Sequence, residues 1–267
     1  MKALKYLAAL MAIALIAAAC GSSTDAASGD GGDDGASADF ETVTDGTLTV
    51  CTDVPFPPME FEDSSTDTGF NGFDIELAGA IAQDNGLDLA VVTPGWDAIT
   101  SGLAMEAGDC DIAVSSITIT EEREEGVDFS EPYFSAEQSL FVAADSDATS
   151  AADLGTLAVQ SGTTGEIYSQ ENFDNELLAF DDAGSLYIAL EAGEVDGVVT
   201  DQIGNQGFAD DNPGVGKIIG TFDTQELYGM AVQEEGSEDL LAAVNASLAK
   251  FNDDGTYDSI FDSWFDA

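Results

Sequence analysis

The sequence predicts an α/β protein with two lobes that are joined by two extended segments. From residue 47 onward, short runs of β-branched residues alternate with helical patterns, which is typical of a mainly parallel sheet. Two such units follow one another, and extended runs at 138–144 and 226–233 connect them. The chain therefore crosses to a second lobe and returns, and the cleft between the lobes is the expected place for a ligand.

The first unit opens with a strand at 47–52. The helix predicted at 73–84 has an apolar stripe and is stopped by Asn85 and Gly86. The other elements predicted for this unit are a strand at 87–93, a helix at 96–107 and a strand at 111–115.

The second unit follows the first extended run. Its predicted elements are a strand at 156–160, a helix after Thr164, a helix at 183–192, a strand at 195–200 and a helix from Asp201. Two helices, at 237–251 and 256–265, follow the second extended run. No internal repeat of fixed period is visible, which argues against a solenoid.

The charge balance excludes several classes of function. The 267 residues include 53 Asp and Glu, 5 Lys and Arg and no His, and the formal net charge is −48. Such a charge repels nucleic acid and anionic headgroups, so no nucleic-acid partner is expected. The lack of His removes the commonest zinc ligand and the usual base of catalytic triads. We expect no metal, no cofactor and no catalytic residue.

Residues 1–19 have the pattern of a cleaved leader. Lys2 and Lys5 precede an apolar stretch, and small residues lead to Cys20, as in bacterial lipoprotein leaders, whose cysteine carries the lipid. The alternatives are an ordinary secretory leader and a membrane-spanning anchor, for which the apolar run is short. Residues 20–39 are small and polar and are expected to form a flexible tether, so the globular part would be lipid-anchored at the cell surface or in the periplasm.

Ligands of open α/β sheets bind beyond the carboxyl ends of the strands, where this chain places polar groups. Asp53 follows the first strand, Ser115, Ser116 and Thr118 follow the third, and Asp201 follows a later one. Asp201 could bind an amine, or it could cap its own helix. We expect these side chains to face one cleft.

Arg123 is the only arginine of the chain. A guanidinium binds a carboxylate through two parallel hydrogen bonds, and the neighbouring hydroxyls complete the anion's surroundings. The alternative is a surface arginine neutralised by Glu121, Glu122 or Glu125. Its scarcity favours a functional role.

The loop at 161–165 offers backbone N–H groups at a helix start, which suits a carboxylate. Thr163 or Thr164 could instead serve only as the helix cap. Phe56 and Trp96 are candidates to enclose a ligand, although packing in the core is the alternative for each.

Cys51 and Cys110 are predicted to be buried free thiols. They fall at opposite ends of neighbouring strands, about 10 Å apart, whereas a disulfide needs Cα atoms within about 7 Å.

The segments TDVPFPPMEF, GFNGFDIELAGAIA, WDAITSGL, GDCDIAVSSITITEEREEGVDFSEPYF, LAVQSGTTGE, GEVDGVVTDQ and DGTYDSIFDSWF resemble, in order, those of the solute-binding proteins of ABC transporters for polar amino acids. The resemblance spans residues 46–266. It implies a two-lobed periplasmic-binding-protein (flytrap) fold with two hinge strands. Lobe one would comprise residues 40–137 and 231–267, and lobe two residues 138–230.

The same resemblance implies roles for the candidate residues. Arg123 would bind the α-carboxylate of an amino acid with Thr118 and Thr164, and Asp201 would bind the α-amino group. The family implies contacts with the ligand also for Asp53, Phe56, Trp96, Ser115, Ser116 and Thr163, and Gly165 stands where the family often has Gln.

The implied function is the extracellular binding component of an ABC amino-acid importer, a monomer that delivers its ligand to a permease and is not an enzyme. Acidic ligands are disfavoured, because Lys217 and Lys250 lie far from the motif loops, so a polar or cationic amino acid or a related zwitterion is expected. The alternative is a dehydratase on the same fold, whose acid or base would have to be a carboxylate.

Overall fold

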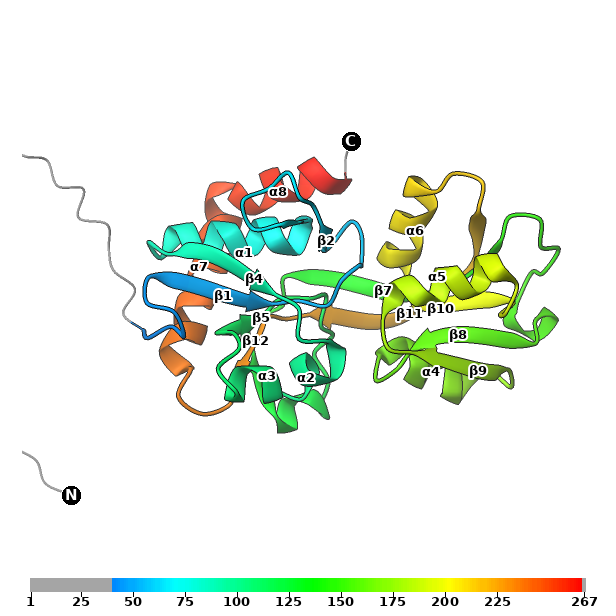
Figure 1. Cartoon of the computed structure of the whole chain (residues 1–267), viewed down its shortest axis with the longest axis horizontal. Coiled ribbons are helices and arrows are strands. Elements are labelled where there is room, and N and C mark those ends of the chain that lie inside the picture. Colours follow the sequence, from blue (N-terminus) through cyan, green and yellow to red (C-terminus); the bar gives the residue numbers. More distant parts are fainter. Residues whose placement is uncertain (1–39, 266–267) are drawn as a thin grey trace, which may run out of the picture. The chain divides into compact units, whose positions relative to one another are not determined.

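The computed structural model describes residues 40–265 (Figure 1). The predicted leader at 1–19 and the predicted tether at 20–39, which includes Cys20, lie outside these residues. Two five-stranded sheets form the centres of two lobes, which we call the first and the second lobe. The lobe boundaries expected from the family resemblance stay predictions.

The first lobe has a mixed sheet in the order β4-β1-β5-β12-β6. β4 and β5 run parallel to β1, and β12 is antiparallel to β5 and β6. The strands are β1 (Thr47–Cys51), β4 (Asp88–Val92), β5 (Ile112–Ala113), β6 (Val127–Phe129) and β12 (Ala231–Gln233).

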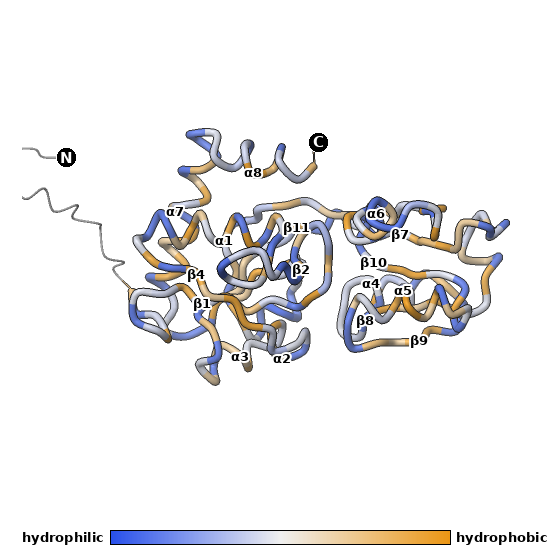
Figure 2. The backbone as a smooth tube through the Cα atoms, turned by 45° about the horizontal axis from the view of Figure 1, so that its top comes forward, coloured by the Kyte–Doolittle hydropathy of each residue, from blue (hydrophilic) through white to orange (hydrophobic). Residues whose placement is uncertain are grey.

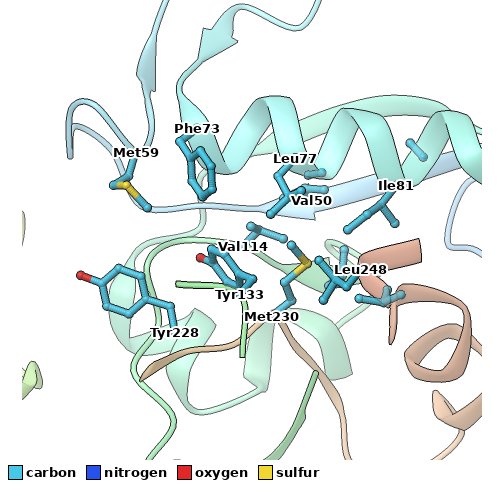
Figure 3. Packing of buried hydrophobic residues seen from close by; sticks show 14 of the residues in the cluster. Val50, Met59, Phe73, Leu77, Ile81, Val114, Tyr133, Tyr228, Met230 and Leu248 are labelled. Atoms are coloured by element: carbon cyan, nitrogen blue, oxygen red, sulfur yellow. The ribbon is translucent and has the colours of Figure 1, made fainter. Parts of the chain in front are cut away.

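Helices cover both faces of this sheet (Figure 1). Alternate residues of a strand face opposite sides, so Val50 packs in one apolar cluster and Cys51 in another. The larger cluster includes Phe73, Leu77 and Leu248, which Figure 3 shows together with Val50. It is closed by α1 (Phe73–Asp84), α7 (Glu238–Asp254) and α8 (Thr256–Phe265), and the smaller cluster by α2 (Trp96–Thr100) and α3 (Leu103–Glu106).

The second lobe has a sheet in the order β11-β7-β10-β8-β9. The strands are β7 (Phe134–Ala143), β8 (Thr156–Gln160), β9 (Glu176–Phe180), β10 (Gly197–Asp201) and β11 (Gly216–Tyr228), with helices α4 (Thr164–Asn172), α5 (Ala183–Ala192) and α6 (Gln202–Asp211). Figure 2 shows apolar stretches along strands such as β10, which is buried throughout.

The prediction of mainly parallel sheets is right for part of each sheet. β8, β9 and β10 are parallel, but β7 and β11 run antiparallel to their neighbours. β7 and β11 are the two long segments that connect the lobes, so they enter and leave the second sheet in opposite directions. The remaining short elements are β2 (Phe61–Glu62), β3 (Phe70–Asn71) and the 3-10 turns η1 (Arg123–Glu125) and η2 (Ala151–Asp153).

The single helix predicted at 96–107 is wrong, because the structure divides it into α2 and α3. Gly102 separates them in the left-handed conformation, with φ of 78°. A Cβ atom at this position would stand 2.7 Å from the carbonyl oxygen of Gly126. Glycine is therefore required both by the backbone angle and by the close approach of residue 126.

The prediction of two free thiols is also wrong, because Cys51 and Cys110 form a disulfide with Cα atoms 5.6 Å apart. The predicted separation assumed a strand at 111–115 and an extended chain from Cys110 into it. β5 contains only Ile112 and Ala113, so Cys110 belongs to the turn before the strand and lies over the end of β1. Both cysteines are buried in the smaller apolar cluster of the first lobe.

Residues 40–265 contain neither a candidate membrane-spanning helix nor a candidate metal-binding cluster. None of the helices there is both long and apolar enough to span a membrane. No group of three or more His, Cys, Asp or Glu side chains in this range is arranged to hold a metal ion.

Candidate functional site

A cavity lies between the two lobes. All ten side chains proposed from the sequence line it. The structure adds Glu60, Gln160, Ala183 and Thr200 to Asp53, Phe56, Trp96, Ser115, Ser116, Thr118, Arg123, Thr163, Thr164 and Asp201. Their roles toward a ligand stay proposals, but their convergence is a geometric fact.

The fold explains this convergence through the ends of its strands. Asp53 follows β1, Ser115 and Ser116 follow β5, and Asp201 ends β10. Carboxyl ends of parallel strands meet at one edge of each sheet, and in both lobes this edge borders the cavity. Ser116 has a φ of 49°, which is uncommon for a residue with a Cβ atom and turns the chain out of the sheet.

Arg123 is buried in the cavity wall rather than exposed on a helix surface. Its Nη1 donates to the carbonyl oxygen of Thr118 (2.7 Å) and its Nη2 to that of Gly162 (3.2 Å). Its guanidinium carbon stands 5.0 Å from the centre of the Trp96 ring. Among the described residues it forms no salt bridge. The alternative that neighbouring glutamates neutralise it on the surface is therefore wrong.

Burial lowers the pKa of Arg123, and the negative charges of Asp201 and Glu226 oppose this effect. An arginine remains charged in proteins, so the cavity holds a buried cation without a direct ionic partner. An anion that entered the cavity would find this charge desolvated and available.

The carboxyl groups of the cavity have pKa values above their ordinary range. Burial raises the pKa of Asp53 to about 6 and that of Asp201 to about 7, where Glu226 adds to the shift. A nearby cation would favour the ionised form of both carboxyls and lower these values. Both are therefore places where a positive group of a ligand would be stabilised.

Asp201 does not cap its helix through its side chain. Its two carboxylate oxygens instead accept hydrogen bonds from the Gln138 amide and the Tyr228 hydroxyl. Thr163, by contrast, does cap α4: its hydroxyl oxygen accepts a hydrogen bond from the N–H of Glu166 (3.2 Å), and its O–H donates to the Gln160 carbonyl (2.8 Å).

The hydroxyls of Thr118 and Thr164 donate to the same oxygen, Oε2 of Glu226, at 2.6 and 2.7 Å. A hydroxyl has one proton to donate, so in this arrangement neither can also donate to a ligand. Thr118 follows a strand of the first lobe and Thr164 begins a helix of the second lobe. Glu226 thus connects the two lobes beside the cavity.

Sequence reasoning missed several polar residues of this region, among them two glutamates and a glutamine. Glu60, Gln160 and Glu226 fall in segments that read as ordinary loop or strand, and among 53 acidic residues no glutamate stands out. Gln160 is the last residue of β8, so the strand-end rule would have found it; its amide donates to Asp53 Oδ2 at 2.7 Å.

The fold is that of a two-lobed binding protein, with a cavity between the lobes. Residues 48–267 match the sequence profile of the bacterial extracellular solute-binding proteins, family 3. The chain belongs to this family.

Curated relatives agree with this assignment. The chain is 36% identical over 198 residues to the ABC transporter glutamine-binding protein GlnH of Bacillus subtilis, covering 72% of each chain. It is 30% identical to a probable histidine-binding protein of Neisseria gonorrhoeae, covering 81% of this chain and 82% of that one.

Solved structures agree as well. An ancestral arginine-binding protein bound to arginine has a TM-score of 0.75 at 37% identity, covering 82% of this chain and 98% of that one. The ancestral amino acid-binding protein AncCDT-1, described as a precursor of cyclohexadienyl dehydratase, has a TM-score of 0.72 at 34% identity, covering 82% and 95%.

The chain is therefore the amino-acid-binding component of an ABC importer and not an enzyme. The relatives are named as binding proteins, and the dehydratase precursor is itself an amino acid-binding protein. The dehydratase alternative is not supported.

Proposed function

We propose that the cavity binds an amino acid with a cationic or uncharged polar side chain. One observation carries this proposal: among residues 40–265, Arg123 is the only cationic side chain that lines the cavity, and the lining also contains the carboxyl groups of Asp53, Glu60 and Asp201. The α-carboxylate of a ligand would neutralise Arg123. No second cation would then remain for an acidic side chain, whereas carboxyl groups remain for a basic one.

The two lysines of the described chain support this charge argument. Lys217 donates to the carbonyl oxygens of Ala144 (3.3 Å) and Ser146 (2.8 Å), and Lys250 forms a salt bridge with Asp84. Neither lines the cavity. Relatives named as binding glutamine, histidine, arginine, or lysine, arginine and ornithine are consistent with such a ligand.

The ligand would be oriented by its α-groups. Arg123 would bind the α-carboxylate and Asp201 the α-ammonium, while Asp53, Phe56 and Trp96 would surround the side chain. Ser115, Ser116, Thr118, Thr163 and Thr164 would shape the cavity wall, because each of these hydroxyls is engaged within the protein.

Calorimetry with arginine, lysine, histidine, glutamine and glutamate tests the ligand class. We expect at least one basic or amide amino acid to bind at least tenfold more tightly than glutamate, which corresponds to about 1.4 kcal/mol. Tighter binding of glutamate than of all the others would contradict the proposal. A thermal-shift series with the same compounds gives an independent check, since a ligand that binds only the folded form raises the Tm.

Binding would proceed by closure of the lobes around the ligand. The described structure has direct contacts across the cavity: Trp96 Nε1 donates to the Gly162 carbonyl (3.1 Å), and Gln160 Nε2 donates to Asp53 (2.7 Å). Contacts that exist only in the closed form make a ligand shift the population toward closure.

Gly207→Ala should weaken binding by opposing this closure. On α6, a Cβ atom of residue 207 would stand 2.2 Å from the carbonyl oxygen of Pro57 in the first lobe. Alanine favours the helix by about 1 kcal/mol, so the second lobe should fold normally. We expect at least a tenfold rise in Kd, measured by calorimetry, and a larger radius of gyration in X-ray scattering with ligand.

Gln206→Ala is the matched control for this variant. Gln206 lies next to Gly207 on the same helix, is exposed, and donates only to Asp210 Oδ1 (2.9 Å). Its substitution should leave the affinity unchanged. Unchanged binding by Gly207→Ala would mean that the ligand does not require this approach of the lobes.

The membrane anchor and the transport partner are part of the same proposal. Cys20 would carry a lipid, residues 20–39 would tether the binding lobes, and the monomeric protein would deliver its ligand to ABC permease subunits at the cell surface or in the periplasm. The motif that ends at Cys20 supports the anchor. Cys20→Ala should shift the protein from the membrane fraction to the soluble fraction; retention in membranes would exclude lipidation at this residue.

A further inference from the structure

Glu60 lines the cavity and has a second buried carboxyl group as its neighbour, that of Asp74 on α1. Their exposed fractions are 1% and 0%. Ser116 contacts both: its N–H donates to Asp74 Oδ2 (2.7 Å) and its hydroxyl to Glu60 Oε2 (3.3 Å). One residue thus holds the two carboxyl groups together.

The pair has no counter-ion among the described residues. Groups from several elements face it: Asp53 after β1, Tyr133 before β7 and Tyr257 on α8. Each of these groups is either negatively charged or neutral. Two adjacent carboxylates without a cation cannot both stay ionised in a buried place, so the pair retains a proton.

The hydrogen bonds indicate where this proton lies. Ser115 donates to Glu60 Oε1 (2.9 Å), and Tyr133 donates to Asp74 Oδ2 (2.9 Å). Together with the two bonds from Ser116, three of the four carboxyl oxygens have donors. Asp74 Oδ1 is buried and receives none, and the Glu60 carboxyl is within hydrogen-bonding reach of Asp74. A proton shared by the two carboxyl groups satisfies the remaining oxygen.

The pKa directions agree with this geometry. Burial raises the pKa of Glu60 well above its ordinary range, and the charge of Asp74 adds to the effect. Burial also raises the pKa of Asp74 to about 7.

We propose that Glu60 is a second specificity-determining carboxyl of the cavity, which shares a proton with Asp74 in the empty site and releases it when the cationic group of a ligand arrives. This inference rests on the proposed function, because it requires an amino acid in the cavity. The only bond broken is the carboxyl O–H bond, and its proton passes to solvent. The bound cation then compensates the second negative charge of the pair.

A neutral side chain would leave the shared proton in place. A cationic ligand should therefore release more protons than glutamine does. Its affinity should also rise with pH relative to that of glutamine, by up to about tenfold per unit while the pair is protonated, because protons compete with the cation. Protons released through Asp201 by the α-ammonium are common to both ligands and cancel in the comparison. Asp53 is another source of released protons, and its contribution must be separated from that of Glu60.

Calorimetry near pH 7 in phosphate and in Tris measures the number of protons released, because these buffers differ in ionisation enthalpy. With the wild-type protein we expect arginine to release more protons than glutamine does. Glu60→Gln should remove most of this excess, and Asp74→Asn should also reduce it, because Glu60 then has no carboxylate beside it. Glu62→Gln is the matched control: it makes the same substitution at an exposed glutamate of β2 and should keep the excess.

The possible outcomes separate this inference from the proposed function. An excess that persists in Glu60→Gln would assign the proton to Asp53 and overturn the inference. Equal proton release by arginine and glutamine in the wild type, or binding of glutamine without binding of arginine, would also overturn it. If the variants do not fold, the pH dependence of the wild-type arginine-to-glutamine affinity ratio decides, and a flat ratio contradicts the inference. If no amino acid binds, the proposed function itself fails.

Discussion

Arg123→Ala is expected to abolish amino-acid binding in a protein that remains folded. In the part of the chain that the structure describes, the guanidinium is the only cation that lines the cavity, and a buried charged partner of a carboxylate contributes about 3 kcal/mol or more. Kd should rise at least a hundredfold for every ligand that the wild type binds, since all amino acids share the α-carboxylate. Calorimetry measures the loss, and circular dichroism verifies the fold.

Lys217→Ala is the matched control for this prediction. It also removes one positive charge from the acidic chain, but from an exposed side chain outside the cavity. We expect its affinities to equal those of the wild type. If Arg123→Ala kept ligand affinity within tenfold, the carboxylate would be bound elsewhere, and the roles proposed for the cavity would have to be reassigned.

Reduction of the Cys51–Cys110 disulfide is expected to lower the free energy of unfolding by about 4 kcal/mol. The two cysteines are 59 residues apart in sequence, so the bond removes much of the conformational freedom of the unfolded chain. The double variant Cys51→Ala/Cys110→Ala should show a similar loss, measured by urea unfolding without ligand.

The control is to measure the stability of the wild type and of the double variant with and without the reductant. Adding dithiothreitol should lower the stability of the wild type and leave that of the double variant unchanged. If the wild type kept its stability when thiol titration shows full reduction, the disulfide would contribute nothing to the folded state.

Much of the fold and of the cavity could be predicted from the sequence, because two simple rules apply. The alternation of strands and helices indicates the two α/β units, and the strand-end rule selects Asp53, Ser115 and Asp201 as neighbours in space. Arg123 stood out because it is the only arginine. These features depend on local pattern and on composition, which a sequence contains directly.

The parts that were missed depend on burial and on distant contacts. Glu60 and Asp74 differ from the other acids only in being enclosed, which no local pattern indicates. β9 is a largely exposed strand at the edge of its sheet, and its sequence pattern is too weak to identify it as a strand. The disulfide was missed because its prediction needed the true length of β5. In each case the missing information is three-dimensional.

The carbonyl oxygen of Gly162 accepts hydrogen bonds from both Trp96 and Arg123 of the first lobe. One peptide oxygen of the second lobe therefore accepts a hydrogen bond from Arg123, the side chain that would bind the carboxylate of the ligand. No substitution of the Arg123 side chain can retune ligand recognition while leaving this bond between the lobes intact. The contact uses the backbone of Gly162, whose φ of 71° favours glycine, so a biosensor built on this scaffold should keep both residues and vary other positions of the cavity wall.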